Sequence, residues 1–202
     1  MTPSKTEQLR HIRDEVWNLQ TSPLYEYRKK NNYYPVLGEG SHDAGIMFVG
    51  EAPGLNEART GRPFCGAAGQ ILDKLLASVS IPRKSVYVTN IVKDRPPDNR
   101  DPFKNEIDTY APFLMRQITI IQPKLIATLG RFSMDFIMRQ FNLGDHITSI
   151  SRMHGQIFEA QSSFGDIALL PLFHPAVAAY EESKLPILLE DFKAVAPFFL
   201  SS

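Results

Sequence analysis

The sequence predicts a three-layer α/β/α fold with a central, mostly parallel sheet of four strands. Four short apolar runs recur along the 202-residue chain, and segments with helical spacing of apolar residues separate them. Because the connections are short, each strand is expected to lie parallel to the next between two helical layers. No repeat, low-complexity tract or linker divides the chain, so we expect one domain over residues 1–202.

The first half of the chain predicts two helices and two strands. Residues 5–20 have apolar positions at helical spacing, and the segment 23–40 is broken by Pro, Asn and Gly. Residues 46–49 form a continuous apolar run, which is typical of a strand buried on both faces. Helical spacing returns over 69–79, and residues 86–90 are strand-like.

The second half continues the alternation. Residues 106–121 predict a helix, and 125–130 predict a third buried strand. A helix over 132–141 follows, and the apolar run 167–173 is the fourth strand. The last helix is expected over 186–198, which completes the order of elements.

Composition excludes several classes of protein. Lys plus Arg number 22 and so do Asp plus Glu, so any contact with a polyanion needs a local basic patch. The N-terminus mixes both charge signs, and no apolar stretch approaches the roughly 18–20 residues that span a bilayer, so we expect a soluble, cytoplasmic protein with no membrane partner. A single cysteine cannot form an internal disulfide or a cysteine metal cage.

Three loops follow the predicted strands and contain most of the polar residues of interest. In α/β folds, ligands bind beyond the carboxyl ends of the strands. This rule selects the loops that begin at Gly50, Asn90 and His174. The first loop, GEAPGLNEARTGRPFCGAAG, is rich in glycine but lacks the Lys-Ser/Thr of a P-loop and the GxGxxG spacing of a dinucleotide site.

Four motifs occur in order and at family spacing: GEAPGLNEARTGRPFCGAAGQILD, VYVTNIVKDRPPDNRDP, PKLIATLGRFSM and PLFHPA. Over roughly residues 24–195 the chain resembles the family 4 uracil-DNA glycosylases of bacteria and archaea. The resemblance implies an enzyme of base excision repair that flips uracil out of DNA and hydrolyses its N-glycosidic bond, leaving an abasic site. Two alternatives remain: a non-catalytic protein that binds uracil or abasic DNA, and a glycosylase for another deaminated base.

The resemblance also assigns roles to five residues. Phe64 would stack on the flipped base, and the Asn90 amide would read the uracil edge. His174 would donate a hydrogen bond to uracil O2 as negative charge develops there, and Glu51 would orient or activate water. The backbone of Gly50 would line the same pocket. Each side chain also has a purely structural reading: Phe64 as core, Asn90 as a turn residue, His174 as a strand end and Glu51 as a loop cap.

A neutral chain needs local basic groups to hold DNA, and the basic residues on or beside the three loops are the candidates. They are Arg59, Arg62, Lys93, Arg95, Arg100 and Arg131. We expect salt-sensitive binding of uracil-containing DNA, single- or double-stranded, by a monomer.

The main departure from the family concerns its metal cluster. Typical members hold a four-iron four-sulfur cluster through four cysteines, and by register those positions are Leu19, Ser22, Asp94 and Tyr110. Thiolates are the ligands that such a cluster requires, so we predict no cluster and no metal. Either a hydrogen bond of Asp94 or Tyr110 or aromatic packing by tyrosines of the segment 23–40 is expected to replace it.

Three smaller expectations complete the comparison with the family. Cys65 is expected to be a small, buried residue of the pocket wall. Val177 and Tyr180 are the sizeable candidates for the wedge that fills the gap left by a flipped base, and a weak wedge would favour single-stranded or mismatched uracil. The segment KDRPPDNRDP contains no histidine, so no stable cross-link to DNA is expected.

Overall fold

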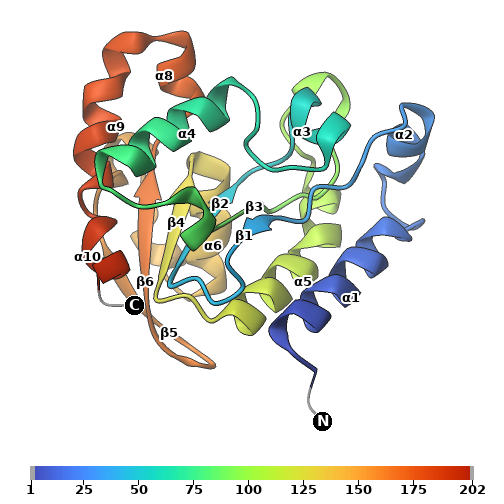
Figure 1. Ribbon diagram of the computed structural model, residues 1–202, viewed down its shortest axis with the longest axis horizontal. Coiled ribbons are helices and arrows are strands. Elements are labelled where there is room, and N and C mark those ends of the chain that lie inside the picture. The colour runs from blue at the N-terminus through green and yellow to red at the C-terminus, as the bar shows by residue number, and fades with distance from the viewer. Residues whose placement is uncertain (1–2, 201–202) are drawn as a thin grey trace.

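The computed structural model, which describes residues 3–200, has a mixed sheet of six strands in the order β1-β3-β2-β4-β6-β5 (Figure 1). The strands are β1 Glu39–Gly40, β2 Ile46–Gly50, β3 Tyr87–Asn90, β4 Leu125–Leu129, β5 Phe158–Ser162 and β6 Gly165–Leu172. β2, β3, β4 and β6 pair in parallel with their neighbours, whereas β1 and β5 pair antiparallel at the two edges.

The expected count of four strands is therefore wrong, because the two edge strands lack the signal of a buried strand. β1 has only two residues, one of them glycine. β5 alternates between half-buried and exposed residues, as an edge strand does when one of its faces is open to solvent. By contrast, every residue of β2 and β4 is buried, which explains their continuous apolar sequences.

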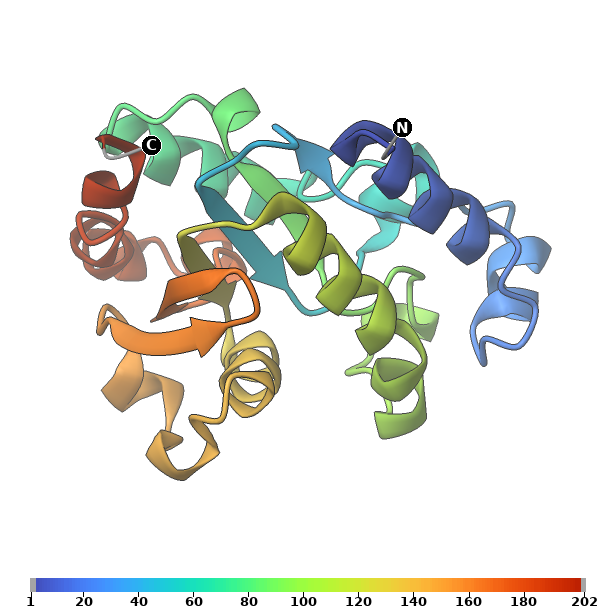
Figure 2. The same ribbon diagram turned by 90° about the horizontal axis from the view of Figure 1, so that it is seen from below.

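Helices cover both faces of the sheet (Figures 1 and 2). They are α1 Lys5–Trp17, α2 Tyr25–Lys30, α3 Leu55–Thr60, α4 Ala67–Ser78, α5 Lys104–Ile121, α6 Arg131–Gln140, α7 Ile150–Met153, α8 Ala176–Tyr180, α9 Leu185–Phe192 and α10 Ala196–Leu200. Short 3₁₀ turns lie at Arg83–Ser85, Pro97–Asn99, Gly144–His146 and Glu182–Lys184. One apolar core joins the sheet to α1, α5, α6 and α7, and the other joins it to α4, α8 and α9.

Local sequence explains where two helices begin and end. α1 begins with a capping box, in which Ser4 Oγ accepts from the Glu7 N–H at 3.2 Å and Glu7 Oε2 accepts from the Ser4 N–H at 2.7 Å. The expected last helix over 186–198 is in fact two helices, α9 and α10. Pro197 fits the break, because in a continuous helix it would have no N–H to donate to the Lys193 carbonyl and its ring would clash with that carbonyl.

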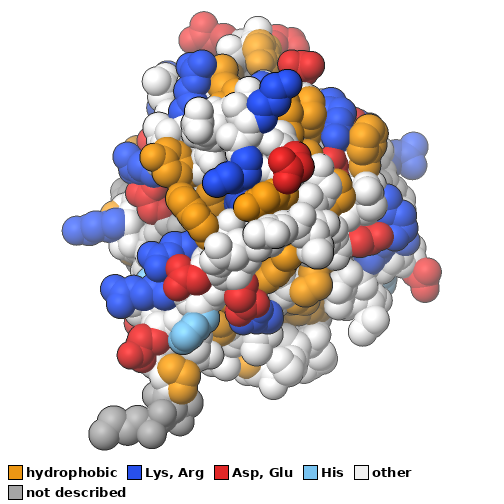
Figure 3. All heavy atoms as spheres, turned by 90° about the vertical axis from the view of Figure 1, so that its right-hand side faces the viewer, with side chains coloured by type: hydrophobic (Ala, Val, Ile, Leu, Met, Phe, Trp, Pro, Cys, Tyr) orange, Lys and Arg blue, Asp and Glu red, His pale blue; other side chains and the backbone are white. Residues whose placement is uncertain are grey.

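The side of the molecule formed by α1, α2 and α3 has acidic, basic and hydrophobic side chains interspersed (Figure 3). This mixture agrees with the equal numbers of acidic and basic residues. Within residues 3–200, no helix combines the length and the apolar character needed to cross a membrane.

The carboxyl ends of the parallel strands meet at one edge of the sheet. Gly50 at the end of β2 is in register with Asn90 at the end of β3. Leu129 at the end of β4 is likewise in register with Leu172 at the end of β6. The three loops selected from the sequence therefore start side by side.

Candidate active site

A cavity of about 320 Å³ opens at this edge of the sheet. Its walls include Glu51, Phe64, Asn90 and His174, which are far apart in the sequence. Such a volume lies at the lower end of the range for small-molecule sites. The structure thus brings together the four side chains that the sequence singled out.

Asn90 supplies the polar floor of the cavity. Its residue is only 2% exposed, yet within residues 3–200 its side-chain amide makes no hydrogen bond to protein. Its amide faces the cavity, and a ligand that covered this amide without hydrogen bonds to it would lose on the order of 1–3 kcal/mol. The Asn90 amide is therefore available for a ligand that presents a donor and an acceptor.

Gly50 makes room for this amide. A Cβ atom on Gly50 would lie 2.3 Å from Asn90 Oδ1 and 2.7 Å from Phe64 Cζ. Both distances are shorter than van der Waals contact, so any side chain at this position would push the amide or the ring out of place.

The Lys93 side chain is enclosed in the protein and hydrogen-bonds the Asn90 backbone, so its predicted role in DNA binding is wrong. Its side chain is fully buried, and Nζ donates to the Asn90 carbonyl at 2.7 Å, to Thr89 Oγ1 at 2.9 Å and to Gln117 Oε1 at 2.6 Å. Burial lowers the pKa of Lys93 well below its usual value. A side chain enclosed in this way does not reach a phosphate.

Phe64 forms the aromatic wall. Its ring lies against that of His174, with 5.7 Å between the centroids, and its backbone has a positive φ of 48°. A non-glycine residue in this region stores roughly 1–3 kcal/mol of strain, and such strain concentrates at functional sites. The contacts that hold the strained turn are therefore part of the site.

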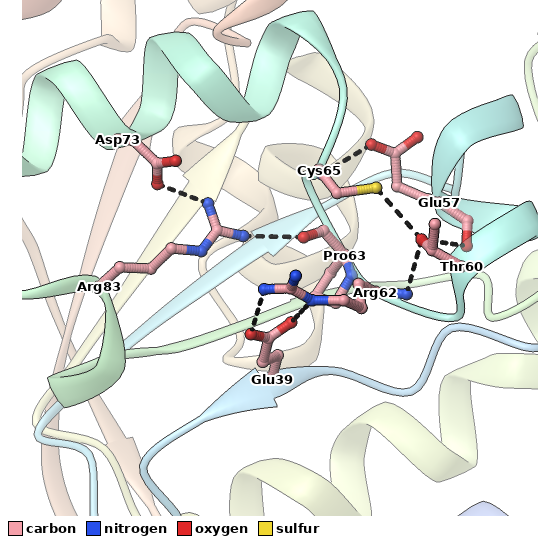
Figure 4. Close-up of polar contacts among 8 residues, drawn as sticks. All are labelled: Glu39, Glu57, Thr60, Arg62, Pro63, Cys65, Asp73 and Arg83. Carbon is pink, nitrogen blue, oxygen red and sulfur yellow. Dashed lines mark hydrogen bonds and ion pairs between the residues drawn. The ribbon is translucent and has the colours of Figure 1, made fainter.

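Glu57 holds that turn, and the sequence analysis missed it. Its Oε1 accepts from the Cys65 N–H at 2.9 Å (Figure 4) and from the Gly66 N–H, also at 2.9 Å. These amides follow Phe64 directly, so the Glu57 carboxylate fixes the direction of the aromatic ring. No spacing rule links a glutamate to amides eight and nine residues later, so the sequence carried no signal for this contact.

Cys65 is not part of the pocket wall, contrary to expectation. It is exposed, and its Sγ lies 3.3 Å from Thr60 Oγ1 (Figure 4). The turn places Phe64 inward, and the next side chain accordingly points out.

Glu51 is half-buried at the mouth of the cavity. Burial raises the pKa of Glu51 to about 7, with a further rise from Asp101 and an opposing effect of Arg131. Its carboxylate makes no hydrogen bond to the part of the protein that the structure describes. A carboxyl group of this kind can accept a proton near neutral pH.

His174 is a neutral hydrogen-bond donor. The Ala176 N–H donates to His174 Nδ1 at 3.1 Å, so the ring proton is placed on Nε2. Burial lowers the pKa of His174 to about 4, although Glu57 opposes this effect. The imidazole therefore presents an uncharged Nε2–H at neutral pH.

The predicted DNA-binding arginines fall into two groups. Arg59, Arg62 and Arg131 are exposed; Arg62 pairs with Glu39 at 2.8 Å (Figure 4), and Arg131 pairs with Asp101 at 3.0 Å. Surface pairs of this kind are weak, so both guanidinium groups can exchange a carboxylate for a phosphate.

The second group, Arg95 and Arg100, forms hydrogen bonds within the protein. Arg95 is buried and donates to Asn99 Oδ1 at 2.7 Å and to two tyrosine hydroxyls, so its predicted role in DNA binding is corrected. Arg100 lines the cavity but is held by Glu106 through bonds of 2.8 and 2.6 Å. Arg100 therefore remains a candidate for DNA binding only at the rim of the cavity.

The positions that the family resemblance assigns to cluster ligands hold a hydrogen-bonded group instead. The Tyr110 hydroxyl donates to Asp94 Oδ2 at 2.6 Å and lies 2.6 Å from Ser22 Oγ. Arg28 Nη1 lies 3.3 Å from Asp94 Oδ1. We name these four residues, Ser22, Arg28, Asp94 and Tyr110, the Asp94 network.

This donor set does not fit an iron–sulfur cluster. Leu19 has no metal-binding atom, and the other three positions offer a hydroxyl, a carboxylate and a phenol rather than thiolates. Burial raises the pKa of Asp94, while Arg28 opposes the rise. Both replacements left open by the sequence are present, because Tyr110 donates to Asp94 and the rings of Tyr33 and Tyr34 pack against those of Tyr27 and Trp17.

The wedge candidates lie on α8 beside the cavity. Tyr180 is 92% exposed, and Val177 is half-buried. The adjoining Ala176 lines the cavity, so α8 continues the wall that His174 begins.

Comparison with known proteins gives one consistent family. The model of the uracil DNA glycosylase superfamily matches residues 37–197. The chain is 42% identical to a type-4 uracil-DNA glycosylase of Sulfurisphaera tokodaii, over 94% of this chain and 84% of that protein. It is 39% identical to the type-4 uracil-DNA glycosylase of Archaeoglobus fulgidus, over 94% and 92%, and 35% identical to that of Thermotoga maritima, over 96% of each. The protein belongs to the uracil DNA glycosylase superfamily.

Proposed function

We propose that this protein is a uracil-DNA glycosylase that hydrolyses the N-glycosidic bond of uracil in DNA. The observation that carries the proposal is the buried Asn90 amide without a protein partner, beside the Phe64 ring. The names of the type-4 relatives, which align over more than nine-tenths of the chain, support the same reaction.

Asn90 would select uracil by its hydrogen-bonding edge. The amide oxygen accepts from N3–H, and the amide NH₂ donates to O4. Cytosine presents the reverse pattern at these atoms, and it would leave the buried amide mispaired at a cost of a few kcal/mol. Phe64 would stack on the face of the flipped base, which contributes on the order of 1–3 kcal/mol.

The reaction breaks the bond between uracil N1 and the sugar C1′. The bonding electrons leave with uracil, whose O2 becomes negative, and the sugar becomes an oxocarbenium-like cation. The His174 Nε2–H would donate to O2, a contact worth about 3 kcal/mol in comparable oxyanion sites. Water adds to C1′, and the Glu51 carboxylate would orient this water and accept its proton.

The decisive experiment compares the wild type with Asn90→Ala and His174→Ala on a uracil-containing oligonucleotide, with alkali to cleave abasic sites. Asn105→Ala and His11→Ala, which change exposed residues of the same types on helices, serve as matched controls. We expect cleavage by the wild type and both controls, and losses of about 100-fold or more in the two site variants.

Absence of product with the wild type would reject the enzyme. Retained binding of the same oligonucleotide would then favour the non-catalytic alternative. Faster release of another deaminated base, such as hypoxanthine, would favour the other glycosylase.

We further propose that the protein works as a monomer without an iron–sulfur cluster. The Asp94 network occupies three of the four positions that would supply thiolates, and the fourth is Leu19, which supports the absence of a cluster. Purified protein should be colourless, with no iron or acid-labile sulfide. A brown preparation containing both would overturn the proposal.

We also propose a preference for uracil that is easily extruded. Apart from Val177 and the exposed Tyr180, α8 offers only alanines, so we expect a weak wedge that poorly compensates the cost of extrusion. Cleavage should decrease from single strands to U:G and then to U:A duplexes. Equal rates on all three substrates would argue against a weak wedge.

A further inference from the structure

A second concave site lies beside the end of α1. It has a volume of about 270 Å³, and residues of α1, of α2 and of the segment 31–35 line it. Four of its lining residues are aromatic: Trp17, Tyr25, Tyr33 and Tyr34. None of the lining residues is acidic. We name this site the Trp17 groove.

The groove presents an aromatic pair to solvent. Trp17 is 48% exposed and Tyr34 is 47% exposed, and their ring centroids are 5.9 Å apart. Large aromatic side chains usually bury most of their surface, so two touching exposed rings mark a binding surface. Such rings offer flat faces on which any nucleobase can stack, for about 1–3 kcal/mol per base.

Basic groups without ion-pair partners lie on the elements beside this pair, and Lys29 lines the groove itself. Lys29 and Lys30 lie at the end of α2, and Arg59 lies near the end of α3. All three are exposed, and none of them forms an ion pair within residues 3–200. Arg62, Arg116, Arg131 and Arg139, by contrast, each pair with a carboxylate. The one acidic residue of α2, Glu26, is in its first turn.

Helix α3 lies between the Trp17 groove and the cavity described above. The Tyr34 N–H donates to the Ala58 carbonyl of α3 at 2.7 Å, and a Cβ atom placed on Gly61 at the end of that helix would lie 3.4 Å from Tyr34 Cβ. The other end of α3 begins at Gly54, which lines the cavity. Six helical residues span about 9 Å, which corresponds to roughly three base steps of a DNA strand.

The wall of the groove is held in place from inside. Arg28 Nη2 donates to the Trp17 carbonyl at 2.7 Å, and Nη1 donates to the Val16 carbonyl at 3.2 Å. The Arg28 guanidinium also lies over the Tyr25 ring at 5.1 Å. Figure 3 shows hydrophobic side chains among basic ones on this side of the molecule.

We propose that the Trp17 groove binds unpaired nucleotides of the DNA strand next to the target uracil. Trp17 and Tyr34 stack on a base, and Lys29, Lys30 and Arg59 contact the phosphates. The choice of DNA as the ligand rests on the proposed function. The chemistry of the groove suits an unpaired strand, because a base inside a duplex has no free face for Trp17.

Trp17 is the only tryptophan of the chain, so its fluorescence reports directly on the groove. The test titrates the wild type at low salt with a single-stranded oligonucleotide that contains no uracil. We expect saturable quenching of Trp17 fluorescence. Anisotropy of the labelled oligonucleotide should give the same dissociation constant.

Variants of the groove residues test whether the oligonucleotide binds at the Trp17 groove. Tyr34→Ala and the double variant Lys29→Ala/Lys30→Ala should each weaken binding by about 5- to 30-fold. The control is Lys84→Ala, because Lys84 is exposed and lies just before the amino end of β3, whereas the cavity lies at the carboxyl ends of the strands. Replaced side chains are all exposed, so the variants should fold, which circular dichroism checks.

Unchanged Trp17 fluorescence at saturating oligonucleotide would overturn the proposal. Binding by Tyr34→Ala and by the double lysine variant as tight as that of Lys84→Ala would also overturn it. Because the oligonucleotide lacks uracil, these results are independent of the cleavage assay. Failure of the proposed function would appear there as missing product, whereas failure of the groove appears here as missing quenching.

Discussion

The Tyr110 hydroxyl donates a 2.6 Å hydrogen bond to the Asp94 carboxylate, and both groups are buried. This contact joins α5 to the loop that follows β3. Ser22 and Arg28 extend it to the segment between α1 and α2. The Asp94 network thus connects the N-terminal segment to the loop that forms one wall of the cavity.

Tyr110→Phe should lower the free energy of unfolding by about 1–3 kcal/mol, because it removes one buried hydrogen-bond partner from Asp94 Oδ2 and one from Ser22 Oγ. Urea denaturation measures this change. Tyr180→Phe, which alters an exposed tyrosine, is the matched control. A Tyr110→Phe variant within about 0.5 kcal/mol of the wild type would show that the network does not stabilise the fold.

The pH dependence of activity should follow Glu51. Its carboxylate form is the one that accepts a proton, and its pKa is raised to about 7. Activity should therefore rise with pH through about 7 and level off above it. His174, with a pKa of about 4, stays neutral over this range and should not cause an inflection. Steady-state rates of uracil release between pH 5 and pH 9 measure the profile.

Two variants test whether Glu51 causes the inflection of the pH–activity profile. Glu51→Gln should be slow at every pH, with no inflection near 7. Asp101→Asn should move the inflection to lower pH, because Asp101 helps to raise the pKa of Glu51. An unchanged profile in Glu51→Gln would assign the titration to another group.

The same shift affects stability. The pKa of Glu51 is higher in the folded state than in the unfolded chain, so folded protein holds the extra proton between about pH 4.5 and 7. Its contribution to stability is thus lost as the pH rises through this window. At pH 8 Glu51→Gln should be more stable than the wild type, by about 1 kcal/mol after solvent screening of a half-buried group. Thermal unfolding at pH 5 and pH 8 checks the sign.

Gly50→Ala should abolish most activity while the protein stays folded. The new methyl group would overlap Asn90 Oδ1 and the Phe64 ring, so both side chains must move into the cavity. We expect at least a 100-fold loss in kcat/KM, because small displacements of binding groups have effects of this size. Gly144→Ala is the control, since its Cβ would find no atom closer than 3.7 Å. Activity near that of Gly144→Ala would contradict the geometry described for Asn90.

Replacing Lys93 should lower stability without changing the salt dependence of DNA binding, whereas replacing Arg59 should do the reverse. Lys93→Met leaves three buried oxygen acceptors without a donor and should cost about 2–3 kcal/mol of stability. The salt dependence of its DNA binding should be unchanged.

Arg59→Ala should leave stability unchanged and reduce the slope of log K against log salt by roughly 0.7–0.9. A reduced slope in Lys93→Met would contradict the burial of that side chain.

β2, β4 and β6 could be predicted because each contains a continuous apolar run, which is typical of a strand buried on both faces, and β3 because its residues favour strands. β1 and β5 could not be predicted in this way. β1 is set by the partner it finds in β3, and β5 by a hairpin with β6. Their positions depend on tertiary pairing, which leaves little trace in local sequence.

The cavity could be predicted from the rule that loops after parallel strands share one edge of the sheet. That rule places Glu51, Asn90 and His174 together, but it does not say which neighbouring side chain points in. Cys65 shows this limit, because a shift of one residue from Phe64 puts it outside. Lys93 shows the same limit, since a loop residue that appears basic in sequence is enclosed in the structure.

The Asp94 network also bears on how the protein tolerates its surroundings. Hydroxyl, carboxylate and guanidinium groups are not oxidised under conditions that convert thiolates to sulfenic acids or disulfides. A cluster-free connection between the N-terminal segment and the loop after β3, as proposed above, needs neither a supply of iron nor a reducing medium. Aeration, peroxide and chelators should leave this part of the molecule intact.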